Sequence, residues 1–138
     1  MLQTVTALRV LALDYGSARC GCAVSDPTGV LATPLEPVLR PTSRPGLARI
    51  VELVDELGAE RVLIGLPLGL SGADTAQTKE TRGFAKSLGK LVSVPIELYD
   101  ERFTTRLAQR DGGGTGARAS EDSRAAAHLL SSWLERHG

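Results

Sequence analysis

The sequence predicts one α/β domain built on a mixed five-stranded sheet that is flanked by helices. Three observations lead to this prediction. The first three apolar segments are separated only by tight turns, the later ones alternate between strand-like runs and helical periods, and no internal repeat or linker divides the chain. With 138 residues, of which 42% are hydrophobic, the chain can bury one core, and we expect residues 1–138 to form a single domain.

The first three strands are expected to form an antiparallel meander. Residues 7–14 ("ALRVLALD") are nearly continuously apolar, which is typical of a central strand covered on both faces. A turn at 16–18 leads to a second strand at 20–25. The tight-turn signal "DPTG" at 26–29 then allows residues 30–33 to return as a third strand.

The chain then changes to a helical period. Apolar residues from Arg44 to Leu57 fall on one helical face, namely Leu47, Ile50, Val51, Val54 and Leu57. Ser43 is the expected N-cap and Gly58 the expected C-terminal cap. The next segment, "RVLIGLP" at 61–67, predicts a short buried strand that ends in a loop.

A second helix is expected from near Asp74, whose spacing to Gln77 resembles a capping box, to about Leu88. The segment "VPIELYDE" at 94–101 predicts the fifth strand. Strand–helix–strand alternation in this half requires parallel pairing.

The last part of the chain is expected to be helical with one interruption. We expect a short helix at 104–110, a flexible loop "DGGGTG" at 111–116 that becomes ordered on binding, and a final helix at 120–136.

Composition and charge exclude several classes of protein. The 16 basic and 16 acidic residues give zero net charge, which argues against coating nucleic acid with the whole surface but permits a local basic groove. No apolar run approaches the ~18 residues that a membrane span needs, and "MLQTVTALR" does not resemble a signal peptide. Cys20 and Cys22 are expected to be reduced and buried, which indicates a cytoplasmic protein without a membrane partner.

Carboxylates stand at three places where the predicted fold forms a crevice. Asp14 ends the first strand, Asp100 and Glu101 end the fifth, and Asp122 lies in the first turn of the last helix. The carboxyl ends of neighbouring parallel strands line the ligand crevice of an open α/β sheet. Clustered carboxylates repel one another unless a cation joins them, so the arrangement predicts a site for Mg²⁺ or Mn²⁺. Such ions activate water for phosphodiester cleavage.

Each of these acids also has a simpler interpretation. An aspartate at a strand end commonly forms a turn, an acid in the first turn of a helix is favoured by the helix dipole, and "YDER" at 99–102 is compatible with a surface ion pair. Only their combination on this topology favours a metal site.

Four segments resemble the blocks of the YqgF/RuvX family, in that family's order and over roughly residues 9–134: "LALDYGSARCGCAVSD", "IGLPLGLSG", "YDERFTT" and "EDSRAAAHLLSSWL". That family resembles the Holliday-junction resolvase RuvC and shares the ribonuclease H-like (RNase H-like) fold. The resemblance implies a metal-dependent nuclease, linked in bacteria to 5′-end processing of precursor 16S ribosomal RNA and thus to ribosome biogenesis.

The resemblance also implies residue roles. Asp14, Glu101 and Asp122 match the family's catalytic acids and would hold Mg²⁺ or Mn²⁺, with Asp100 as a second-choice ligand. The candidate nucleic-acid-binding residues are Arg19, Arg102, Thr104, Thr105, Arg106, Arg118 and Arg124. Arg19 is equally compatible with pairing to a nearby acid. The segment before Asp122 lacks the lysines that are frequent in the family, which weakens the expected affinity for nucleic acid.

Several functions stay open at this point. The first is an RNA nuclease acting on precursor ribosomal RNA, with ribosomal particles as further partners. The second is a structure-specific DNA nuclease that resolves branched junctions, and the third a non-catalytic binding module. "DYGSARCGCAVSD" also resembles the phosphate loop of sugar kinases and actin-like ATPases, which need two such domains. The expected oligomeric state is a monomer or a weak homodimer.

Overall fold

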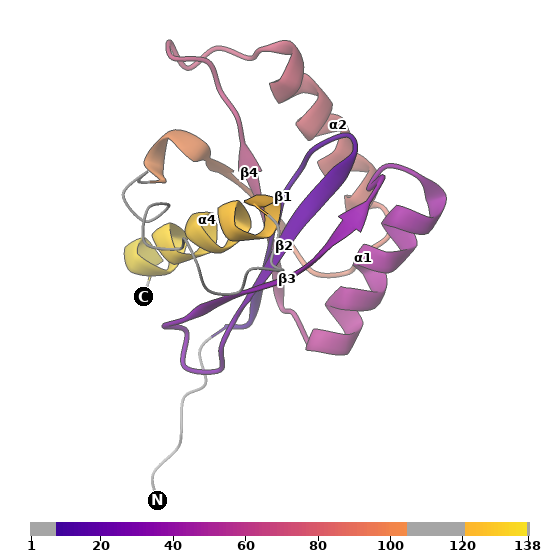
Figure 1. Cartoon of the computed structure of the whole chain (residues 1–138), viewed down its shortest axis with the longest axis vertical. Helices are drawn as coiled ribbons and strands as arrows, with labels where there is room; N and C mark the ends of the chain where they lie inside the picture. The colour runs from indigo at the N-terminus through magenta and orange to yellow at the C-terminus, as the bar shows by residue number, and fades with distance from the viewer. Residues whose placement is uncertain (1–7, 105–120, 138) are drawn as a thin grey trace, which may run out of the picture.

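A computed structural model describes residues 8–104 and 121–137, and these ranges form one five-stranded sheet with helices on both faces (Figure 1). The strands are β1 (Val10–Asp14), β2 (Arg19–Ser25), β3 (Ala32–Leu39), β4 (Arg61–Leu66) and β5 (Ile96–Asp100). The helices are α1 (Arg44–Leu57), α2 (Ala76–Gly89), the short 3₁₀ helix η1 (Glu101–Phe103) and α4 (Glu121–His137). The predicted fold class is confirmed.

The order of the strands brings three carboxyl ends together. The sheet runs β3-β2-β1-β4-β5, with β2 antiparallel to both β1 and β3. Strand β4 is parallel to β1 and to β5, with Leu13 opposite Ile64 and Leu66 opposite Asp100. The ends of β1, β4 and β5 therefore form one side of the sheet, which we call the carboxyl edge.

Two apolar cores lie on the two faces of the sheet. Along β1, Leu11 and Leu13 point into the core beneath α1 and α2, whereas Val10 and Ala12 point into the core beneath α4. Figure 1 shows α4 on one side of the sheet and α1 and α2 on the other. Since β1 is covered on both faces, its sequence is a continuous apolar run.

Helix α1 begins and ends at the predicted caps. The Ser43 hydroxyl accepts a hydrogen bond from the backbone N–H of Gly46 (3.1 Å). Gly58 follows the helix with φ 64°, a left-handed conformation that suits glycine.

Several predicted boundaries differ from the structure. Strands β1 and β5 begin at Val10 and Ile96, later than the predicted residues 7 and 94. Strand β3 extends to Leu39 instead of ending at residue 33, because it is an edge strand and edge strands tolerate prolines such as Pro34 and Pro37. Helix α2 begins after Thr75, close to the predicted start near Asp74, but its capping box joins Thr75 to Thr78 and not Asp74 to Gln77. Of the predicted helix at 104–110 and loop at 111–116, only Thr104 lies within the described residues.

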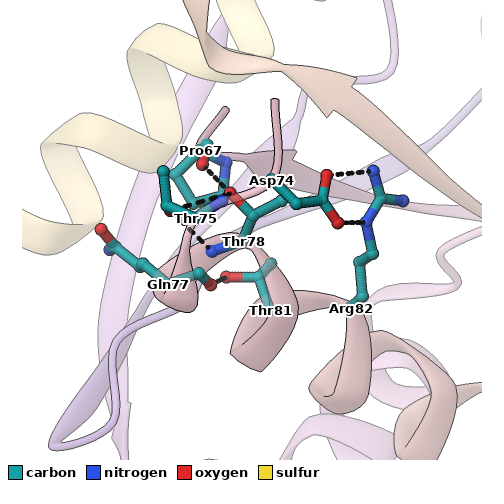
Figure 2. A network of polar contacts seen from close by, with 7 residues as sticks. All are labelled: Pro67, Asp74, Thr75, Gln77, Thr78, Thr81 and Arg82. Atoms are coloured by element: carbon teal, nitrogen blue, oxygen red, sulfur yellow. Dashed lines mark hydrogen bonds and ion pairs between the residues drawn. The ribbon is translucent and has the colours of Figure 1, made fainter. Parts of the chain in front are cut away.

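The start of α2 is tied to the end of β4 by the polar network shown in Figure 2. The Thr75 hydroxyl accepts from the backbone N–H of Thr78 (3.2 Å), and the Thr78 hydroxyl accepts from that of Thr75 (3.0 Å). The Thr78 hydroxyl also donates to the Pro67 carbonyl. Asp74 instead holds Arg82 through two parallel contacts of 2.9 and 3.1 Å.

In the described part of the chain, no helix is long and apolar enough to cross a membrane.

Candidate active site at the carboxyl edge

Asp14 and Glu101 meet across β4. Asp14 is the last residue of β1, and Glu101 is the first residue of η1, directly after β5. Their side chains share a hydrogen bond, although β4 lies between their strands. Gly65 of β4 makes this contact possible, because a Cβ atom there would lie 2.8 Å from Oε2 and 3.1 Å from Cγ of Glu101. The missing side chain leaves the space that the Glu101 side chain occupies.

A second glycine lets the start of α4 approach the same site. Gly21 of β2 pairs directly with Asp14. A Cβ atom on Gly21 would lie 1.9 Å from the backbone oxygen of Asp122 and 2.7 Å from the backbone nitrogen of Ser123. The backbone N–H of Cys22 donates to the Ser123 hydroxyl (3.2 Å). These contacts fix the first turn of α4, and with it Asp122, on the strand beside Asp14.

The electrostatics of the site are those of carboxylates held close together. Burial raises the pKa of Asp14 to about 7, with further contributions from the charges of Glu101 and Asp122 and from the hydrogen bond to Glu101. Burial also raises the pKa of Glu101, and the charge of Asp100 adds to this, although the hydrogen bond with Asp14 opposes it. Below about pH 7, Asp14 is therefore mostly protonated and donates the hydrogen bond to Glu101.

The carboxylates form a pair with a third charge nearby. Within residues 8–104 and 121–137, no three Asp, Glu, His or Cys side chains converge closely enough to hold a metal ion. Glu101 is hydrogen-bonded to Asp14, whereas Asp122 affects Asp14 only through its charge. The donors nevertheless suit a hard divalent cation, since carboxylate oxygens are its preferred ligands and a cation favours their ionised form.

Asp100, the second-choice ligand, is engaged elsewhere. Its carboxylate receives the Arg102 guanidinium through Nη2 (2.7 Å) and Nε (3.0 Å), and also the backbone N–H of Arg102 (2.9 Å). These contacts lower the pKa of Asp100, and the hydrogen bonds from the Arg102 guanidinium have the largest effect. The Arg102 guanidinium also donates to the Leu70 carbonyl (3.4 Å), and thus joins the end of β5 to the β4–α2 loop.

The other predicted nucleic-acid-binding residues lie in different surroundings. Arg19 is exposed at the start of β2, and Arg124 is half-buried in α4. The Thr104 hydroxyl is buried and has no hydrogen-bond partner in the described ranges. Thr105, Arg106 and Arg118 lie outside the described residues.

The residues that position the acids were not predicted from the sequence. Gly21 and Gly65 stand inside strands, where glycine often marks the close approach of another segment, so this signal was available. Ser123 gave no signal, because serine is common where a helix begins. Tyr15 is a further example: its hydroxyl donates to Glu80 (2.8 Å) and its ring stacks on Phe84 (4.7 Å), which anchors the residue after Asp14 to α2.

Comparisons with known proteins agree with this architecture. Residues 8–136 match the RuvX family, which is described as "Holliday junction resolvase". A protein of Mycobacteroides abscessus named "Putative pre-16S rRNA nuclease" is 40% identical over 93% of this chain and 81% of its own length. One of the same name from Koribacter versatilis is 38% identical over 94% of this chain and 88% of its own.

Among solved structures, RuvC of Thermus thermophilus in complex with a Holliday junction substrate superposes with a TM-score of 0.68. The match covers 95% of this chain and 96% of that one at 16% identity, and it therefore shows a shared fold.

Proposed function

The chain belongs to the RuvX family, and on this basis we propose that it is a divalent-metal-dependent nuclease that cuts RNA in the 5′-end processing of precursor 16S ribosomal RNA. The observation that supports this most strongly is the contact between Asp14 and Glu101, with the charge of Asp122 acting on Asp14. Ionisable groups with strongly raised pKa values cluster at functional sites. Their place at the carboxyl edge is where open α/β sheets bind ligands.

We assign Asp14, Glu101 and Asp122 as the residues that hold Mg²⁺ or Mn²⁺. When bound, such an ion lowers the pKa of a coordinated water and stabilises the leaving oxygen of a phosphodiester. Asp14 contributes in its ionised form, so its raised pKa makes the site weaker in acid. Gly21 and Gly65 keep the acids in position, and Arg102, fixed by Asp100, presents a guanidinium near the same edge for phosphate.

The choice of RNA rests on the names of the relatives, two of which are 38% and 40% identical to this chain. From the same names we infer that ribosomal particles are its setting. Free thiols at Cys20 and Cys22 suit a reducing compartment, which supports placement in the cytoplasm. The second candidate substrate is a branched DNA junction, which the family description favours.

A cleavage assay tests the proposal and separates the substrates. Wild type, Asp14→Asn, Glu101→Gln and the control Asp55→Asn would each be given a fragment spanning the 5′ end of precursor 16S RNA, an unrelated single-stranded RNA and a four-way DNA junction. Asp55 is an exposed acid of α1 outside the site. We expect cutting of the precursor only with Mn²⁺ or Mg²⁺, retained in Asp55→Asn and lost in the two site variants. Preferential cutting of the junction would show that DNA, and not RNA, is the substrate. Cutting without a divalent metal would refute the metal assignment.

A further inference from the structure

The only three lysines of the chain, Lys79, Lys86 and Lys90, all lie on α2 or at its C-terminal cap. We propose that they form a docking surface for the phosphate backbone of the nucleic-acid substrate, separate from the acids at the carboxyl edge. The partner follows from the proposed function, but the surface itself is inferred from the position and pairing of these side chains. We call it the lysine track.

The three lysines share one side of the helix. Their spacings of seven and four residues bring them close to the same direction at about 100° per residue. The buried residues of α2 point roughly the opposite way and are Thr78, Thr81, Phe84 and Leu88. All three lysines are exposed, and Figure 1 shows α2 on the same side of the sheet as α1, opposite α4.

The lysine charges have no carboxylate partner in the part of the chain that the structure describes, where each salt bridge involves an arginine. The nearby acids are engaged with other groups: Glu80 accepts from the Tyr15 hydroxyl, and Asp74 holds Arg82 (Figure 2). Lys79 helps to lower the pKa of Asp74 without replacing Arg82. A chain of zero net charge thus presents three ammonium groups on one helix face, none of them in a salt bridge within the described residues.

The lysine track and the candidate active site lie on opposite faces of the sheet: α2 packs on the face away from α4, whereas the Glu101 side chain lies over Gly65 on the α4 face, beside Leu129. Helix α2 begins after the β4–α2 loop, whose Leu70 carbonyl accepts from Arg102 at the carboxyl edge. From Lys79 to Lys90 the helix extends about 16 Å, at ~1.5 Å per residue. This length matches about five nucleotides at ~3.4 Å each. A strand that crosses the carboxyl edge from the acids to the α2 face, and then follows this helix, would therefore span all three lysines.

Lysine chemistry also sets the kind of recognition. An ammonium group acts as a compact point charge, without the planar fork by which arginine reads bases or binds a phosphate bidentately. The lysine track is therefore expected to bind the backbone irrespective of sequence, and to do so more weakly as salt rises.

Lysine footprinting on the wild-type protein tests the track without any substitution. An amine-reactive reagent and mass spectrometry would report each lysine separately, with and without a single-stranded RNA oligonucleotide, in EDTA so that no cutting occurs. We expect RNA to reduce labelling at Lys79, Lys86 and Lys90 several-fold. Unchanged labelling at saturating RNA, or the absence of any RNA binding, would overturn the proposal.

A matched pair of variants tests the energetic contribution. K79Q/K86Q/K90Q and R40Q/R44Q/R49Q each remove three positive charges, and the second set lies on exposed positions in or just before α1. By fluorescence anisotropy in EDTA, the lysine variant should bind RNA ~10-fold or more weakly at ~50 mM salt, with a salt slope reduced by about 2. Restoring charge in K79R/K86R/K90R should recover binding. Equal losses in the two charge-removed variants would show that only net charge matters and would overturn the proposal.

The two proposals fail in different ways. A protein that cuts RNA but leaves its lysines fully labelled refutes the lysine track and retains the nuclease. A protein that cuts nothing but protects the three lysines refutes the nuclease and retains the lysine track.

Discussion

Glu101 reaches Asp14 across β4, and the two side chains share a hydrogen bond over the position of Gly65. The contact joins the ends of β1 and β5, which are not neighbours in the sheet. The contact therefore depends on glycine at position 65 of β4 as much as on the two acids.

Replacing Gly65 with alanine should displace Glu101 without unfolding the protein. The new Cβ atom would lie 2.8 Å from Oε2 of Glu101, so this flexible side chain has to move. Because misplacing a functional group by about 1 Å costs ~100-fold in rate, we expect metal-dependent cleavage to fall by roughly 10- to 100-fold. Gly83→Ala is the control, since nothing lies within 4 Å of its added Cβ atom. Wild-type rates in both variants would contradict the role of Gly65.

The backbone of Gly21 packs directly against the backbone at the start of α4. A substitution that separates the two segments should therefore reduce the stability of the protein. A Cβ atom on Gly21 would lie 1.9 Å from the Asp122 carbonyl oxygen, which no rotamer change relieves. We expect Gly21→Ala to lower the free energy of unfolding by about 1–3 kcal/mol. Ser123→Ala, which leaves the buried N–H of Cys22 without its acceptor, should cost about 1–3 kcal/mol. Denaturant titration measures both, and unchanged midpoints would argue against this docking of α4.

The raised pKa of Asp14 predicts an unusual pH dependence for the metal-free protein. Between its ordinary value of 3.8 and about 7, the folded protein holds a proton that the unfolded chain has released. The free energy of unfolding therefore falls as pH rises through this window and is level above it. Relative to Asp14→Asn, wild type in EDTA should lose roughly 2–3 kcal/mol between about pH 5 and pH 8. Parallel stability profiles for the two proteins would show that Asp14 is not perturbed.

Binding of a divalent metal ion should restore the free energy of unfolding that the protein loses as pH rises. An ion that binds only the folded state raises its stability, and it replaces the proton on Asp14. Above pH 7 we expect Mn²⁺ to raise the melting temperature of wild type and of Asp55→Asn, but not of Asp14→Asn. Equal shifts in all three proteins would place the ion elsewhere.

Asp100 and Glu101 are adjacent but should respond differently to substitution. Glu101→Gln removes a carboxylate from the site and should abolish stabilisation by Mn²⁺. Asp100→Asn removes the partner of Arg102 and the cap of η1, so it should reduce stability by about 1 kcal/mol while leaving stabilisation by metal in place. The opposite pattern would make Asp100 the ligand.

Local signals in the sequence predicted much of this molecule. The caps of α1 at Ser43 and Gly58 are correct, because they depend only on neighbouring residues. The meeting of strand ends at the carboxyl edge followed from the topology alone. The full length of β3 was missed, since whether Pro34 breaks a strand depends on its position in the sheet.

The sequence named the three acids but not the residues that position them. Asp14, Glu101 and Asp122 lie where the topology requires, and the metal set that they would form remains a prediction. That Gly65 makes room for Glu101, or Gly21 for α4, involves segments far apart in the chain whose distance no local pattern encodes. Likewise, the choice of Arg102 as partner of Asp100 depends on side-chain geometry.

Direct measurement of Mn²⁺ binding tests the central claim that Asp14, Glu101 and Asp122 form one cation site. Calorimetric titration at about pH 8, where Asp14 is mostly ionised, would compare wild type with Asp14→Asn, Glu101→Gln, Asp122→Asn and the control Asp55→Asn. We expect saturable binding by wild type and by Asp55→Asn, weakened about tenfold or more in each of the other three. The same affinity in all five proteins would contradict the claim.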